Sequence, residues 1–138
     1  MENENRPAIG VATIVLKDGN ILLGKDARKG DVYGLPGGHW ESGETLKECS
    51  IRETREESGV TCSDPTLVSI YDFYREDKKK SYLSVGMKAN YASGDLTDLR
   101  SEGRSQWGWH SYEDAMKLNL FAPDRILLKR FKSGIIYE

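Results

Sequence analysis

The chain has 138 residues and a formal net charge of −2. This length suits one domain with its own core, and the charge provides no broad basic field for binding a nucleic-acid backbone. No segment approaches the roughly 18 consecutive apolar residues of a membrane helix, and residues 1–7 do not resemble a signal or transit peptide. We therefore expect a cytoplasmic monomer or homodimer with a small anionic substrate, and neither a membrane nor a long nucleic acid as partner.

The N-terminal third of the sequence predicts a hairpin followed by a glycine-rich turn. Two apolar segments, Ile9–Leu16 and Asn20–Lys25, flank the turn signal at 17–19. Residues 32–38 then read as a short strand that ends in a Gly-Gly turn, where missing side chains allow the backbone to approach a ligand closely. An ordinary Pro-Gly turn is the alternative interpretation.

A helix is predicted from Thr45 to Ser58. Thr45 and Glu48 form a capping-box start, and Gly59 is a typical glycine stop. At about 100° per residue, one stripe of this helix begins apolar and ends acidic. Its members are Leu46, Cys49, Ser50, Glu53, Glu56 and Glu57. Because the first turns would pack on a core, we expect all three carboxylates to face the protein.

Three clustered carboxylates that face the protein require a counter-charge. Like charges repel one another, and a buried carboxylate is either protonated or paired. A divalent cation meets this need, since Mg²⁺ binds a few carboxylate oxygens and completes its shell with water and phosphate. The alternative is a solvated helix face on which Arg52 and Arg55 form surface ion pairs.

The second half of the chain predicts more strands and a last helix. Thr66–Tyr74 and Ser81–Tyr91 form a candidate pair of strands around the charged run 75–80, which we interpret as a solvated tip, with phosphate contact as the alternative. A short strand is expected at Gln106–His110 and a helix at Pro123–Phe131. This succession is typical of an α+β or mixed α/β fold. The two cysteines lack a partner motif and should be reduced thiols.

Residues 38–60 carry a motif with fixed spacing. Its set positions, G-x5-E-x7-R-E-U-x-E-E-x-G-U with U aliphatic, fall on Gly38, Glu44, Arg52-Glu53, Glu56-Glu57 and Gly59. The segment resembles the Nudix box, and the chain is similar to the Nudix hydrolases, which cleave nucleoside diphosphates linked to another group. One position differs, since Thr54 stands where an aliphatic residue is usual. The resemblance implies an α/β/α sandwich around a mixed β-sheet, with residues 1–138 as one domain.

The resemblance also implies roles for the acidic residues. In the family, the glutamates at positions Glu53, Glu56 and Glu57 hold Mg²⁺, for which Mn²⁺ can substitute, and a carbonyl at the position of Gly37 joins the metal shell. One of these acids, or a carboxylate outside the box, then activates the attacking water.

Two further residues are expected to support the acids. Glu102 is the candidate outside carboxylate, because it lies five residues before Trp107, as a metal-associated glutamate does in related hydrolases of eight-oxo-guanine nucleotides; a plain loop glutamate is the alternative. We expect Arg52 to pair with Glu44 or with the catalytic acids and to orient them.

The substrate class is predicted less directly. Segment 35–44 and Leu120-Phe121 resemble the MutT-like members, which implies hydrolysis of a (d)NTP to a nucleoside monophosphate and pyrophosphate. The downstream proline of the ADP-ribose hydrolases is missing. A nucleotide sugar, a dinucleoside polyphosphate or a capped RNA end remains an alternative substrate. A non-catalytic binding module would be expected to have lost box carboxylates, and this chain retains all of them.

Candidate substrate-binding residues surround the box. They are Tyr33, Gly38, His39, Phe121 and Asp124. Further aromatic residues are available to stack on a base, although aromatic residues in strands commonly belong to a core; these are Trp40, Tyr71, Phe73 and Tyr74. For Asp124, capping of the last helix is the alternative to reading a base edge.

Overall fold

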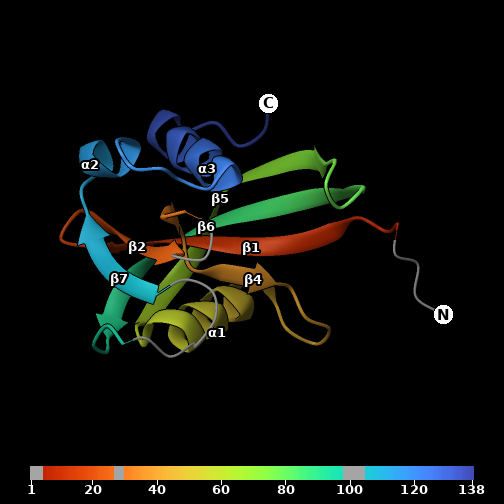
Figure 1. Ribbon diagram of the computed structural model, residues 1–138. Helices are drawn as coiled ribbons and strands as arrows, with labels where there is room; N and C mark the ends of the chain where they lie inside the picture. Colours follow the sequence, from red (N-terminus) through yellow and green to blue (C-terminus); the bar gives the residue numbers. More distant parts are fainter. Residues whose placement is uncertain (1–4, 27–29, 98–104) are drawn as a thin grey trace.

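The computed structural model describes residues 5–26, 30–97 and 105–138. A mixed sheet lies between α1 on one side and α2 with α3 on the other (Figure 1). This arrangement confirms the predicted α/β/α sandwich. The elements in chain order are β1 (Ala8–Lys17), β2 (Asn20–Asp26), β3 (Val32–Gly34), β4 (Gly37–His39), α1 (Leu46–Ser58), β5 (Thr61–Arg75), β6 (Lys80–Ser93), β7 (Ser105–His110), α2 (Tyr112–Met116) and α3 (Ala122–Ser133).

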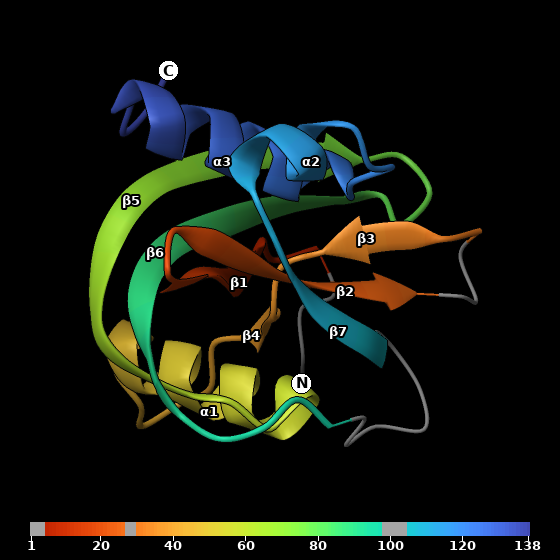
Figure 2. The same cartoon turned by 90° about the vertical axis from the view of Figure 1, so that its left-hand side faces the viewer.

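The sheet combines parallel and antiparallel pairs. Its main strand order is β3-β2-β1-β6-β5, with β4 beside β1 and β7 beside β2. Strands β1 and β6 are parallel, whereas β5 and β6 form a long antiparallel hairpin. Figure 2 shows this hairpin curving from beside α1 to beside α3. One strand pair therefore reaches both helix layers.

The first predicted hairpin forms, but its strands soon part. Pairing of β1 with β2 is limited to Leu16 with Ile21 and Lys17 with Asn20. The earlier part of β1 pairs instead with β4, through Gly10, Val11 and Ala12. The segment after Pro36 is thereby placed against the middle of the sheet.

Alternation along β1 divides the core between the two faces of the sheet. Ala12 and Ile14 pack with Leu127 and Leu128 of α3. Val11 packs with Cys49 of α1 on the other face. Since successive side chains of a strand point to opposite faces, one apolar strand supports both helix layers.

Helix α1 begins and ends as the sequence predicts. The Thr45 hydroxyl accepts a hydrogen bond from Glu48 N at 3.1 Å, and the Glu48 carboxylate accepts one from Thr45 N at 2.8 Å. Gly59 follows with φ of 84°, a left-handed conformation in which a β-carbon would be strained. The two hydrogen bonds between Thr45 and Glu48 fix the first turn of α1, which begins soon after β4 ends at His39.

One prediction for a connecting segment is wrong, and one short helix was not predicted. Gly37 and Gly38 lie in β4 rather than in a turn, paired with Ala12 and Val11. A β-carbon on Gly37 would collide with the Val11 carbonyl oxygen, so glycine is needed for close approach of these strands. The short α2 was not predicted from the sequence; its first turn is capped by the Ser111 hydroxyl, which accepts from Asp114 N at 3.1 Å.

None of the helices in the described part of the chain has the length and apolar composition that a membrane-spanning helix requires.

Candidate active site

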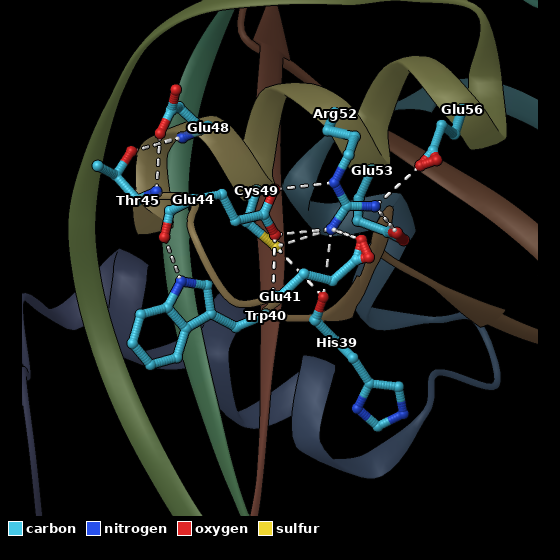
Figure 3. Close-up of polar contacts among 10 residues, drawn as sticks. All are labelled: His39, Trp40, Glu41, Glu44, Thr45, Glu48, Cys49, Arg52, Glu53 and Glu56. Carbon is cyan, nitrogen blue, oxygen red and sulfur yellow. Dashed lines mark hydrogen bonds and ion pairs between the residues drawn. The ribbon is translucent and has the colours of Figure 1, made fainter.

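Arg52 of α1 lies at the centre of a group of carboxylates (Figure 3). Its Nε and Nη2 donate to the two oxygens of Glu44 at 2.9 and 2.7 Å. Its Nη1 donates to Glu53 and to Glu56, both at 2.8 Å. The sequence left open whether Arg52 pairs with Glu44 or with the box acids, and the structure shows both contacts. A planar guanidinium fork holds such a set in fixed orientation better than an ammonium group.

The ion pair between Arg52 and Glu44 shifts the pKa values of both groups. The Arg52 guanidinium lowers the pKa of Glu44 to about 2, and the Glu44 carboxylate in turn raises the pKa of Arg52. Both groups therefore remain charged at neutral pH. Cys49 lies beside them, with its Sγ 3.6 Å from the His39 carbonyl oxygen, and burial raises the pKa of this thiol to about 12. Cys49 is thus a neutral thiol, and both Cys49 and Cys62 are free and buried.

Glu53 and Glu57 are buried against the backbone of β4. Their exposed fractions are 6% and 3%, although both carry a carboxylate. Glu57 Oε1 accepts a hydrogen bond from Gly37 N at 2.7 Å. The Glu53 carboxylate lies where a side chain on residue 38 would stand, so Gly38 permits its close approach. Gly38 of β4 therefore makes room for Glu53, and Gly37 donates its backbone NH to Glu57.

Glu56 departs from the predicted inward stripe. Its side chain is 42% exposed, and its carboxylate pairs with Arg52, one helical turn earlier. Thr54, outside the predicted stripe, is fully buried instead. The buried face of α1 is thus rotated toward Thr54, which leaves Glu56 at the solvent edge. The departure from the motif at this position is accommodated in the core.

The donor chemistry at β4 fits a hard divalent cation. No group of three His, Cys, Asp or Glu side chains close enough to hold a metal occurs among residues 5–26, 30–97 and 105–138. Magnesium, however, is commonly bound through one or two carboxylates, with water and substrate phosphates as its other ligands. The Glu53 and Glu57 carboxylates beside the Gly37 backbone supply that number and type of donor.

A cavity of about 240 Å³ opens on the α3 side of the sheet and reaches β4. Gly10, Ala12 and Ser84 contribute only small side chains to its lining, which leaves the space. Aromatic rings of Phe73, Tyr82 and Phe121 also line it. Four of the five predicted substrate-binding residues line this cavity: Gly38, His39, Phe121 and Asp124.

Tyr33 has a structural role in place of the predicted one, and Asp124 has a structural role in addition to lining the cavity. Tyr33 does not line the cavity; its ring packs edge to face on His110 at 6.0 Å, and its carbonyl accepts from Phe121 N at 2.8 Å. Asp124 does not cap α3, whose N-cap position is Phe121. Its carboxylate accepts from Leu35 N at 2.9 Å and so fastens the start of α3 to the segment before β4.

Some predicted site residues lie away from the cavity, and some residues that line it were not predicted. Trp40 is 45% exposed, with its indole NH bonded to the Glu44 carbonyl at 2.8 Å, and Tyr74 is 55% exposed; neither lines the cavity. Glu102 lies outside the described residues. Sequence reasoning missed Arg75 and Tyr82 as cavity residues. The available signal was strand alternation, which places Arg75 on the same face as Phe73.

Comparison with known proteins identifies the class. A family model described as NUDIX domain matches residues 4–131. The Nudix hydrolase YvcI of Bacillus subtilis (strain 168) is 28% identical over 124 residues, which cover 88% of this chain and 77% of YvcI. An ADP-ribose pyrophosphatase of Methanocaldococcus jannaschii is 34% identical over 94 residues, covering 65% of this chain and 54% of that protein.

Solved structures agree with the sequence comparison. The crystal structure of a MutT NUDIX hydrolase from Burkholderia pseudomallei has a TM-score of 0.81 at 26% identity, covering 91% of this chain and 98% of that one. The fold and the acidic site thus define a pyrophosphohydrolase, an enzyme that acts on diphosphate-containing substrates. The chain belongs to the Nudix hydrolase family.

Proposed function

We propose that this enzyme hydrolyses a nucleoside triphosphate, (d)NTP, to a nucleoside monophosphate and pyrophosphate in a Mg²⁺-dependent reaction. The observation that carries the proposal is the position of β4. Its glycines contact the buried acids Glu53 and Glu57 on one side and line the aromatic cavity on the other. A nucleotide with its base in the cavity would therefore present its phosphates to the acids. The packing of every described element around one sheet supports the proposal that the chain works as a single domain.

Each acid has a distinct role in this proposal. Glu53 and Glu57, together with the Gly37 carbonyl, are the groups that would hold the cation, and Glu56 completes the acidic cluster at its solvent edge. When bound, Mg²⁺ would neutralise phosphate charge and lower the pKa of a water molecule. Arg52 keeps Glu53 and Glu56 oriented through its direct hydrogen bonds. An acid of this group, or Glu102 from outside the box, would orient the attacking water.

The cavity residues provide the binding energy for the nucleoside. Phe121 lies at the start of α3 and Phe73 on β5, and both rings line the cavity, where a planar base could stack. His39 also lines the cavity, and Figure 3 shows its ring directed away from the Arg52 cluster. The small side chains of Gly10 and Ser84 leave the surface open to a flat ring.

A second candidate substrate is a nucleoside diphosphate linked to a sugar. The specific observation in its favour is the relative from Methanocaldococcus jannaschii, which is named as an ADP-ribose pyrophosphatase. Both candidates would place a diphosphate beside β4. They differ in the leaving group, which is pyrophosphate for a triphosphate and a sugar phosphate for ADP-ribose.

Product analysis tests the proposal. The protein is incubated with Mg²⁺ and, separately, each dNTP, ADP-ribose, a nucleotide sugar and a dinucleoside polyphosphate, and the products are separated by chromatography. We expect dNMP and pyrophosphate from a dNTP, with no turnover in excess chelator and recovery with Mg²⁺ or Mn²⁺. Reaction in ¹⁸O water should label pyrophosphate, as expected for attack at the β-phosphorus. Preferential cleavage of ADP-ribose would favour the second candidate, and full turnover in chelator would contradict the metal mechanism.

A further inference from the structure

A column of aromatic rings flanks the cavity on the β5–β6 hairpin. The rings of Tyr71 and Phe73 stack at 5.2 Å with an interplanar angle of 17°, and those of Phe73 and Tyr82 at 5.6 Å and 14°. The Arg75 guanidinium lies 5.9 Å from the centre of the Tyr82 ring. Phe73, Arg75 and Tyr82 all line the cavity. A planar fork of hydrogen-bond donors therefore stands beside the rings on which a base could stack.

Arg75 is held in this position by an exposed neighbour. Its Nε and Nη2 donate to the two oxygens of Asp77 at 3.1 and 2.7 Å. The side chain of Arg75 is 30% exposed, whereas that of Asp77 is 63% exposed. An ion pair with such an exposed acid contributes little to stability, so it can be exchanged at small cost for another acceptor. The ion pair thus orients the Arg75 guanidinium but leaves it able to bind a different acceptor.

The guanidinium fork has a clear chemical preference among bases. Arginine recognises two neighbouring acceptors, such as O6 and N7 of guanine, with two parallel hydrogen bonds. Adenine presents N7 beside the N6 amino group, which is a donor, so it cannot accept both bonds. An arginine beside a stacked base thus distinguishes the two purines.

We propose that Arg75 is the residue that selects the base: on substrate binding it exchanges Asp77 for two neighbouring acceptors on the base edge, which favours guanine over adenine. This inference rests on the proposed function, because it requires a nucleotide base in the cavity. The charged run 75–80 is then more than a solvated tip, since its first residue, Arg75, lines the cavity. In this proposal the Arg75 guanidinium contacts the base of the bound nucleotide.

Affinity and kinetics on matched variants test the inference. Wild type, Arg75→Gln, Arg75→Lys and Asp77→Asn are compared with dGTP and dATP in steady-state turnover. The same proteins are titrated with dGMP and dAMP, which are not cleaved, so that affinity is measured apart from catalysis. Lys78→Gln is the control, because it removes a positive charge from the same hairpin at a residue that does not line the cavity. Thermal unfolding confirms that each variant is folded.

We expect wild type to prefer the guanine nucleotides. Arg75→Gln should raise KM for dGTP and Kd for dGMP about tenfold or more, while the values for the adenine nucleotides change by less than about twofold. Arg75→Lys should lose the same discrimination, since it retains charge but not the fork. Asp77→Asn should keep or improve guanine affinity, because it releases Arg75.

Three results would overturn the inference. Equal losses for guanine and adenine in Arg75→Gln would show that the residue does not read the base. A loss of guanine affinity in Asp77→Asn as large as in Arg75→Gln would mean that the ion pair only shapes the hairpin. If wild type neither cleaves a dNTP nor binds dGMP and dAMP, the proposed function fails and the inference fails with it; cleavage with an unchanged purine ratio in Arg75→Gln defeats the inference alone.

Discussion

The two halves of the site are built in opposite ways. The acidic half comes from residues close in sequence. Arg52 pairs with Glu44, Glu53 and Glu56 and also lies 3.5 Å from the Glu41 carboxylate, so these partners all lie between positions 41 and 56. The cavity half gathers residues from β1, β4, β5, β6 and the start of α3. The acidic half depends on ionised groups held at fixed short distances, whereas the cavity depends on shape. Substitutions in the two halves should therefore affect different kinetic constants.

The largest expected effect is on the buried acids. Glu53→Gln and Glu57→Gln should each lower kcat by at least about a hundredfold with the fold retained, because each change removes charge at the proposed cation site but preserves shape. Turnover is measured with the preferred nucleotide, and circular dichroism checks the fold. Glu48→Gln is the matched control on the same helix, since it keeps the side-chain acceptor that caps Thr45 N. Near-normal turnover of either variant would mean that the metal lies elsewhere.

The next effect sharpens the role of Arg52. Arg52→Lys retains the charge but cannot bond both oxygens of Glu44 while holding Glu53 and Glu56. Because Arg52 in the proposed function orients the acids and does not contact the substrate, we expect kcat to fall about 10- to 100-fold with little change in KM for the nucleotide.

The control for Arg52 is its exposed neighbour on α1, Arg55→Lys, which should be nearly silent. The Mg²⁺ concentration needed for half-maximal activity is measured for both variants and should rise only in Arg52→Lys. A rise in nucleotide KM alone would place Arg52 in the substrate site instead.

A smaller effect is expected in the cavity. Phe121→Ala removes a ring that lines it and should raise KM for a nucleotide by about tenfold while kcat changes less, because stacking acts equally in ground and transition states. Tyr74→Ala is the control, since Tyr74 is exposed and lies outside the cavity lining. Unchanged KM for every nucleotide tested would contradict this assignment of the base site.

The smallest effect concerns stability in acid. Arg52 lowers the pKa of Glu44 from its ordinary value of 4.5 to about 2, so the folded state gains stability from this group at pH above 4.5. That gain should disappear progressively as the pH falls from about 4.5 to about 2. We expect Glu44→Gln to flatten this part of the stability curve, measured by urea unfolding at several pH values. Equal pH dependence in both proteins would show that the ion pair contributes nothing to folding.

Much of the chemistry is readable from the sequence. The capping box at Thr45, the glycine stop at Gly59 and the spacing of the glutamates predict helix α1, and local helix geometry then places Glu53 and Glu57 on one face. The same local reasoning mispositions Glu56, because the rotation of α1 about its axis is set by packing of Thr54 into the core. A stripe calculated from sequence defines relative angles around the helix and not which part of it faces the sheet.

The sequence by itself determined the class of enzyme, through the spacing of the box, and helix α1, through its capping signals, because both depend on short-range spacing. The α/β/α arrangement was predicted only through the resemblance to the Nudix hydrolases. Only the tertiary structure decided that Gly37 and Gly38 form a strand beside β1, that Asp124 fastens Leu35, and that Arg75 lines the cavity. Each of these contacts joins residues distant along the chain, and such contacts arise from how strands pair and how helices pack on the sheet. The physical reason is that backbone hydrogen bonding and close packing select which distant residues come together in space. Local sequence patterns do not specify these partners.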